Sequence, residues 1–232
     1  MTRFPIFLLL ISFALSGCNT EQQSSVPVAP ADSSNEALTR TLDALAQRDS
    51  DALLSTVSGG SKAQEFFASV IDSFEAIDSF REKFVAVYGD EAWTAFQAPL
   101  PEDQKRPDMN LTMPDLEQIR RDSSDWEADD KNGGVFDALP RIPLPFKQVE
   151  GGWVVDGASV FPDEETLIGF TETQKKLTEF IISYIKAIGH EGISSEDIDY
   201  QMGKDLMIVL MGGELKVGGE SPNPDRFKID EL

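Results

Sequence analysis

Cys18 is the only cysteine in the chain, and its thiol is the most reactive side chain that the sequence offers. A cysteine thiol can act as a nucleophile, close a disulfide or carry a covalent modification. With no second cysteine, Cys18 cannot close a disulfide within the chain. Its sequence context favours modification, because it ends the run Leu15-Ser16-Gly17-Cys18 directly after an apolar stretch.

The run from Leu15 to Cys18 resembles the lipobox of bacterial lipoproteins. The resemblance implies a diacylglyceryl group on the Cys18 sulfur, cleavage before Cys18, and a further acyl chain, typically palmitate, on the new amino group. Two or three acyl chains hold a protein stably on a bilayer, whereas one chain holds it only marginally. In this family, Asp after the cysteine retains the protein in the inner membrane. Asn19 therefore favours the outer membrane in a host that has one.

Residues 1–17 have the layout of a secretory signal peptide. Arg3 supplies one positive charge, residues 4–15 are apolar, and Ser16 and Gly17 are small. The apolar run is too short to cross a bilayer, which takes roughly 20 residues. A buried core helix is disfavoured because residues 18–35 are polar, contain prolines and lack periodicity. We expect residues 1–17 to be removed and residues 18–35 to form a lipidated, flexible linker.

The chain is strongly acidic, with 41 Asp and Glu residues against 20 Lys and Arg residues and a formal net charge of −21. Such a surface repels phosphate backbones, so nucleic acid is not an expected partner. Solubility is the simplest role for the charge, and attraction of cations or of a basic partner is the alternative. The expected partners are the membrane, through the lipid anchor, and an envelope protein or a small apolar ligand.

Catalytic motifs are absent from the sequence. His190 is the only histidine, and it follows a predicted helix end at Gly189, where an exposed turn residue is the expected role. No Gly-x-Ser-x-Gly elbow, phosphate loop or dinucleotide fingerprint occurs. The sequence therefore predicts no catalytic residue, no metal ligand and no cofactor.

An acidic run occupies residues 122–130 and could supply oxygen ligands to a cation. Its members are Asp122, Asp125, Glu127, Asp129 and Asp130. Counted from Asp125, a calcium loop would need Gly at the sixth position and Glu at the twelfth, where Asp130 and Phe136 stand. The preferred interpretation is a solvated face, on which Asp125, Glu127 and Asp129 alternate along a strand.

Residues with helical periodicity lie on both sides of a central segment that lacks it. Residues 36–97 and 164–211 are predicted to be helical, and Ser34 or Asn35 is the expected cap of the first helix. The strongest helix spans residues 62–88, with apolar residues at steps of three and four: Phe67, Val70, Ile71, Phe74, Ile77, Phe80 and Phe84. Residues 212–232 are rich in Gly, Pro and charge, which predicts a disordered tail.

Residues 115–160 are predicted to form the sheet. Leu116, Gln118 and Arg120 alternate with their neighbours, and Asn132-Gly133 is a strong hairpin signal. A second hairpin joins residues 144–149 to residues 153–158 through Glu150-Gly151-Gly152. We predict one α+β domain over residues 36–211, in which N-terminal helices pack on a three- to four-stranded antiparallel meander and a C-terminal helical pair is added.

The segment Phe146–Asp156, which closes on the Gly-Trp turn at Gly152 and Trp153, resembles the nuclear-transport-factor-two-like superfamily of cone-shaped α+β folds. The resemblance covers residues 36–160 and implies a hollow cone that could hold a small apolar ligand. The candidate lining residues are Trp93, Trp126, Phe146 and Trp153, for which ordinary core packing is the alternative. Enzymes of this superfamily often use an Asp-His pair in the cone, and these residues include no histidine.

Three hypotheses follow for the function. The first is a non-enzymatic, membrane-anchored exported domain that binds a protein or a small ligand at the cell envelope. The second is an atypical enzyme of the cone fold, in which Asp122 or Glu127 acts as general base with a raised pKa in an apolar pocket. The third is a purely structural interaction module of the envelope.

Overall fold

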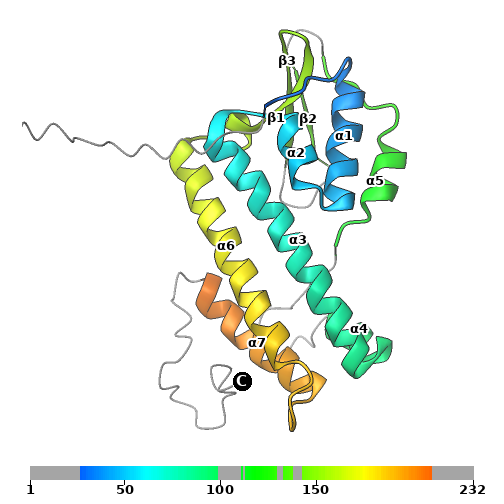
Figure 1. The fold of residues 1–232 in the computed structure, drawn as a ribbon, viewed down its shortest axis with the longest axis vertical. Helices are drawn as coiled ribbons and strands as arrows, with labels where there is room; N and C mark the ends of the chain where they lie inside the picture. Colours follow the sequence, from blue (N-terminus) through cyan, green and yellow to red (C-terminus); the bar gives the residue numbers. More distant parts are fainter. Residues whose placement is uncertain (1–26, 99–110, 112, 130–132, 138–142, 211–232) are drawn as a thin grey trace, which may run out of the picture.

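The computed structural model describes residues 27–98, 111, 113–129, 133–137 and 143–210. Within these residues the predicted α+β class is confirmed, because helices pack on a small sheet (Figure 1). The helices are α1 (Ser34–Gln47), α2 (Ser50–Thr56), α3 (Gly60–Tyr88), α4 (Asp90–Gln97), α5 (Leu116–Asp122), α6 (Glu164–Ala187) and α7 (Ser195–Leu210). The strands are β1 (Val57–Ser58), β2 (Gly134–Phe136), β3 (Leu144–Val149) and β4 (Gly152–Asp156).

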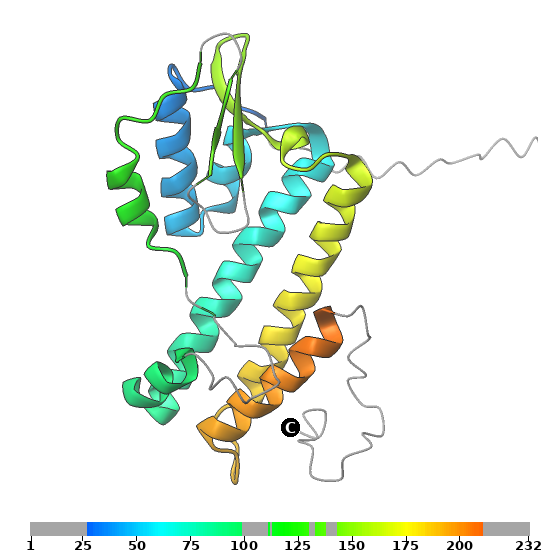
Figure 2. The ribbon, with the colours of Figure 1, turned by 180° about the vertical axis from the view of Figure 1, so that it is seen from behind.

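The long helices α3 and α6 form the frame of the molecule. They lie side by side and run in the same direction, from the sheet end to the end that carries α4 and α7 (Figures 1 and 2). The 29 residues of α3 span about 43 Å at 1.5 Å per residue. Because the pair extends well past the sheet, its two ends lie in different surroundings.

The first apolar core lies at the sheet end of this pair. Helices α1, α2 and α5, the sheet and the first half of α3 contribute to it. Its largest buried members include Leu38, Leu42, Leu45, Leu53, Phe66, Phe67, Ile71 and Leu144. This core holds the antiparallel strands that the sequence predicts.

The second apolar core lies at the opposite end of the pair. The second half of α3, α4, the second half of α6 and α7 contribute to it. Its buried members include Phe80, Phe84, Phe96, Phe180, Ile181, Tyr184, Ile198 and Met202. No strand among the described residues contributes to this core, so it is built from helices together with Leu111, which lies outside them.

A polar seam separates the two cores inside the α3–α6 pair. On α3, Ser73 lies between Ile71 of the first core and Ala76 of the second. The Ser73 hydroxyl lies 2.8 Å from the Thr178 hydroxyl and donates to Gln174 Oε1 at 3.3 Å. Buried hydroxyl groups need such partners, and small side chains let two helices approach closely. Helices α3 and α6 therefore contribute to both cores, and the polar seam keeps the two apolar clusters apart.

The sheet has the order β1-β4-β3-β2 and is mixed, which corrects the predicted antiparallel meander. Strands β2, β3 and β4 pair antiparallel, but β1 pairs with β4 in parallel, with Val57 opposite Val155. The prediction is wrong for β1 because a two-residue strand has no alternation in sequence. Asp129 and Gly133 form an isolated antiparallel bridge, whereas Asn132 of the predicted turn lies outside the described residues.

Residues 116–122 form the helix α5, which corrects the predicted first strand. The Asp115 carboxylate accepts a hydrogen bond from the Gln118 amide at 2.9 Å and so caps the first turn. Leu116 and Ile119 lie one helical turn apart and pack on the first core. Two apolar residues in a segment of seven fit both the helical and the strand period, so the sequence pattern does not distinguish the two. The Asp115 cap and the contact with α1 favour the helix.

The chain enters the fold at residues 29–31. The Ala29 amide donates to the Ser55 carbonyl at 2.7 Å, and Ala31 exchanges two backbone hydrogen bonds with Trp153. The predicted linker over residues 18–35 is therefore wrong at its C-terminal end. Ser33 caps α1, in place of Ser34 or Asn35, because its hydroxyl accepts from the Glu36 amide at 3.1 Å.

Gly152→Ala is expected to destabilise this entry point. Gly152 has φ +139°, and a Cβ there would collide with the carbonyl oxygen of Ala31. We expect a loss of about 1–3 kcal/mol in the free energy of unfolding, the usual cost of a strained backbone position. Urea unfolding measures the loss, and faster hydrogen exchange at the Ala31 and Trp153 amides locates it.

Gly169→Ala is the matched control for this substitution. Gly169 lies within α6, and a Cβ there would meet nothing within 4 Å. Alanine in a helix interior is more stable than glycine by roughly 0.5–1 kcal/mol, so the expected change has the opposite sign. Equal effects of the two substitutions would contradict the assigned role of Gly152.

Candidate functional site

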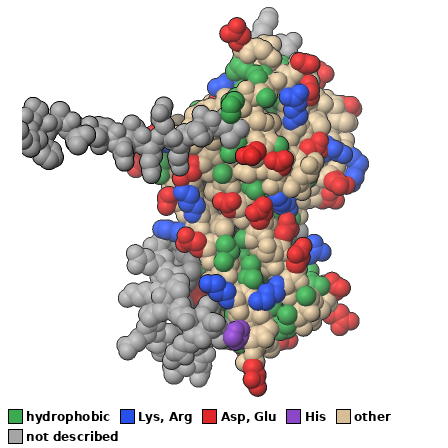
Figure 3. All heavy atoms as spheres, in the orientation of Figure 1, with side chains coloured by type: hydrophobic (Ala, Val, Ile, Leu, Met, Phe, Trp, Pro, Cys, Tyr) green, Lys and Arg blue, Asp and Glu red, His purple; other side chains and the backbone are tan. Residues whose placement is uncertain are grey.

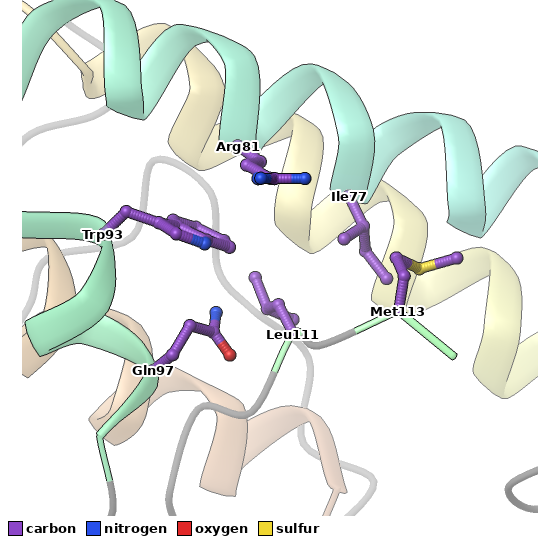
Figure 4. Close-up of a pocket in the computed structure, with 6 residues that line it drawn as sticks. All are labelled: Ile77, Arg81, Trp93, Gln97, Leu111 and Met113. Atoms are coloured by element: carbon purple, nitrogen blue, oxygen red, sulfur yellow. The ribbon is translucent and has the colours of Figure 1, made fainter. Parts of the chain in front are cut away.

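A pocket of about 250 Å³ lies between α3, α4 and the segment that contains residues 111 and 113. Its lining residues are Ile77, Arg81, Trp93, Gln97, Leu111 and Met113, which Figure 4 shows around one space. Leu111, Met113, Ile77 and the indole of Trp93 make its walls apolar. Arg81 supplies the only charged side chain among these six residues.

Two helices position the pocket residues in pairs. Ile77 and Arg81 are four residues apart on α3, and Trp93 and Gln97 are four residues apart on α4, so each pair lies on one helix face. Gly89 allows the sharp turn between the helices: it has φ +89°, and its amide donates to the Val85 carbonyl at 2.9 Å. This turn folds α4 back beside the end of α3.

The indole of Trp93 is held in place by rings of the second core. It stacks on Phe96 with centroids 5.4 Å apart, and its centroid lies 5.8 Å from that of Phe84. Phe80 lies behind it, with its centroid 6.3 Å from that of Trp93. The aromatic wall of the pocket is therefore built before any ligand arrives.

Arg81 carries a positive charge that no acidic side chain among the described residues pairs with. The contrast is Arg48, which contacts Asp78 at 2.7 Å. Acidic side chains are spread over the visible face of the molecule rather than gathered at one place (Figure 3). A guanidinium group binds carboxylates and phosphates through paired hydrogen bonds, so Arg81 gives the pocket a means of holding an anionic group.

The structure does not bring the four predicted aromatic residues together. Trp126 and Phe146 lie in the first core with ring centroids 5.1 Å apart, and Trp153 is buried there in β4. Only Trp93 lines the described pocket, at the other end of α3. The distribution matches core packing for Trp126, Phe146 and Trp153.

Sequence reasoning missed the other pocket residues. Ile77 belongs to the predicted apolar stripe of residues 62–88, where its pattern is the same as that of a core residue. Arg81 lies four residues later on the same helix face, and nothing in its sequence context indicates a binding role. Leu111 and Met113 belong to a proline-containing loop with no periodicity. The one available signal was the four-residue spacing of Ile77 and Arg81 on one helix and of Trp93 and Gln97 on the next. This spacing does not show that the two helix faces pack together.

The acidic run forms no ion site in the described residues. Asp122 ends α5 and accepts from the Gln118 side chain at 2.7 Å, and Asp125 and Glu127 are exposed. Asp130 lies outside the described residues. Across the part of the chain that the structure describes, no three His, Cys, Asp or Glu side chains are spaced to hold a metal ion. Neither Asp122 nor Glu127 lines the pocket, and His190 is exposed after α6.

A buried carboxylate joins α6 to α7, which the sequence did not reveal. Asp205 is only 4% exposed and accepts from the Tyr184 hydroxyl at 2.7 Å and from the Gln201 side chain at 3.2 Å. A buried acid with two donors is stabilised by them. This network fixes α7 on the second core.

Comparisons with known proteins add no relative: no protein-family model, no curated protein and no solved structure matches the chain. The resemblance of residues 36–160 to the nuclear-transport-factor-two-like superfamily stays a prediction. Among the described helices, none combines the length and the apolar character that crossing a membrane requires.

Proposed function

We propose that this protein is an exported lipoprotein, anchored by acyl chains on Cys18, that binds a protein or a small ligand at the cell envelope without catalysing a reaction. The observation that carries the proposal is the run Leu15-Ser16-Gly17-Cys18 after the apolar residues 4–15. Acylation of a single sulfur agrees with a chain that has no other cysteine.

The position of the chain entry supports an anchored domain. Ala29 is bonded to the fold beside Ser55, and Cys18 lies about eleven residues before it. A fully extended chain covers at most about 3.3–3.6 Å per residue, so the tether reaches no further than about 40 Å. Ser55 lies just before β1 and the start of α3, so the tether joins the fold at the sheet end of the molecule.

The position of the pocket supports a binding role at that site. Arg81 lies about twenty residues along α3 from Gly60, which is roughly 30 Å at 1.5 Å per residue. The pocket is therefore at the end of the molecule away from the point where the tether enters the fold. A mostly apolar pocket with a few polar groups is the usual form of a small-molecule site.

Mass spectrometry of the intact protein from its native membrane tests the anchor. We expect a chain that begins at Cys18, with added mass that fragmentation assigns to a diacylglyceryl group on the sulfur and an acyl group on the amine. A protein that retains residues 1–17 and a free thiol would overturn the proposal.

A further inference from the structure

We infer that the pocket between α3 and α4 binds a small apolar carboxylate, whose acid group contacts Arg81 and whose apolar body lies against Trp93. This inference specifies the ligand of the binding function proposed above and rests on that function. It follows from the wall of the pocket, its charge, its rigidity and its size.

The wall of the pocket selects an amphiphilic ligand. Ile77, Leu111 and Met113 offer carbon and sulfur surface, and such a surface favours an apolar body. Figure 4 shows Trp93 between Arg81 and Gln97, with Ile77 and Met113 on the opposite side of the pocket. Arg81 thus supplies the single charged group of a mostly apolar lining, as a ligand with one charged end and an apolar body requires.

The charge of the pocket selects an anion. Asp78, three residues before Arg81 on α3, forms an ion pair with Arg48 at 2.7 Å rather than with Arg81. The net charge of −21 opposes anions at long range. Salt limits that repulsion, because the Debye length is about 8 Å at physiological ionic strength. Arg81 is the one charged side chain among the six described residues that line the pocket, and a carboxylate can accept two hydrogen bonds from its guanidinium group.

The size and rigidity of the pocket narrow the ligand further. A volume of about 250 Å³ is below the roughly 300–1,000 Å³ of sites for drug-sized molecules. One ring with a short acid chain fits this space. Because Phe84 and Phe96 already fix the indole of Trp93, ring stacking on Trp93 needs little further ordering of the protein.

The test compares 3-phenylpropionate with its neutral amide, 3-phenylpropanamide, which has the same apolar body. The full mature lipoprotein is reconstituted in phosphatidylcholine nanodiscs, and binding is measured by calorimetry against empty nanodiscs. We expect the acid to bind at least tenfold more tightly than the amide. Arg81→Met should weaken acid binding at least tenfold and leave amide binding within twofold, since Arg81 is exposed and its loss leaves the cores intact.

Lys176→Met is the matched control. Lys176 is an exposed cation on α6 that does not line the pocket, so its replacement changes the net charge equally without touching the site. We expect its acid binding to stay within twofold of the wild type. Failure of the wild type to bind the acid, equal binding of acid and amide, or equal losses in the two variants would overturn the inference. The mass of the same preparation reports acylation, so failure of the anchor and failure of the pocket are separate results.

Discussion

Cys18→Ser is expected to abolish acylation and to leave residues 1–17 attached. A serine hydroxyl cannot form the thioether that the lipobox resemblance implies, and cleavage before residue 18 follows that step. The intact mass should therefore change in two ways, with the acyl mass lost and the leader mass gained. Loss of two or three acyl chains removes stable anchoring, because each buried CH₂ contributes about 0.8 kcal/mol.

Asn19→Asp is the matched control for this prediction. It leaves Cys18 intact, so the acyl mass and the cleavage should be unchanged. In a host with two membranes, we expect the protein to move from the outer to the inner membrane, which membrane fractionation measures. Normal processing of Cys18→Ser, with the wild-type mass apart from one atom, would contradict the lipid anchor.

Phe80→Ala is expected to lower the free energy of unfolding by about 3–5 kcal/mol, the usual range for a buried phenylalanine. Phe80 is fully buried, and its ring centroid lies 5.6 Å from those of Phe84 and Phe96. Its removal leaves a cavity behind the pocket wall. Because whole domains are stable by only about 5–15 kcal/mol, the effect should be plain in urea unfolding.

The location of the damage is a second readout of Phe80→Ala. The polar seam at Ser73 and Thr178 separates the two cores, so the second core should lose more protection than the first. We expect hydrogen exchange to quicken in α7 more than in α1. Uniform loss of protection in both helices would show that the cores unfold as one unit.

Phe170→Ala is the control that removes the same atoms from a different environment. Phe170 is 49% exposed and stacks on Phe161 with centroids 4.5 Å apart. Only part of its area leaves water on folding, so the expected loss is about 1 kcal/mol. Equal losses for Phe80→Ala and Phe170→Ala would contradict the assignment of Phe80 to the interior of the second core.

Several elements could be predicted from the sequence because their signals are local. The stripe from Phe67 to Phe84 repeats at helical spacing, and Gly89 stands where α3 ends. The hairpin of β3 and β4 turns at Gly151 and Gly152, both of which have positive φ. Hydrophobic periodicity and turn residues determine the structure within a few positions, so they can be read without knowledge of the rest of the chain.

Other elements failed because their signals depend on distant partners. Residues 116–122 became helical through the Asp115 cap and the contact of Leu116 and Ile119 with the first core. Val57 became a parallel strand because Val155 lies beside it, about a hundred residues later in the chain. Ala31 is part of the fold rather than of the predicted linker, because β1 pairs only with Val155 and Asp156 of β4 and Trp153 exchanges two backbone hydrogen bonds with Ala31 instead.

Three features depend only on residue identity or on short spacing, so the sequence alone determined them. They are the lipidation motif that ends at Cys18, the strong acidity of the chain and the positions of the long helices. Only the tertiary structure decided that two cores form on one helix pair and that Arg81, Trp93 and Leu111 surround one pocket. Those three residues come from three separate segments. Their meeting depends on which helix faces pack together, and no local spacing encodes that choice.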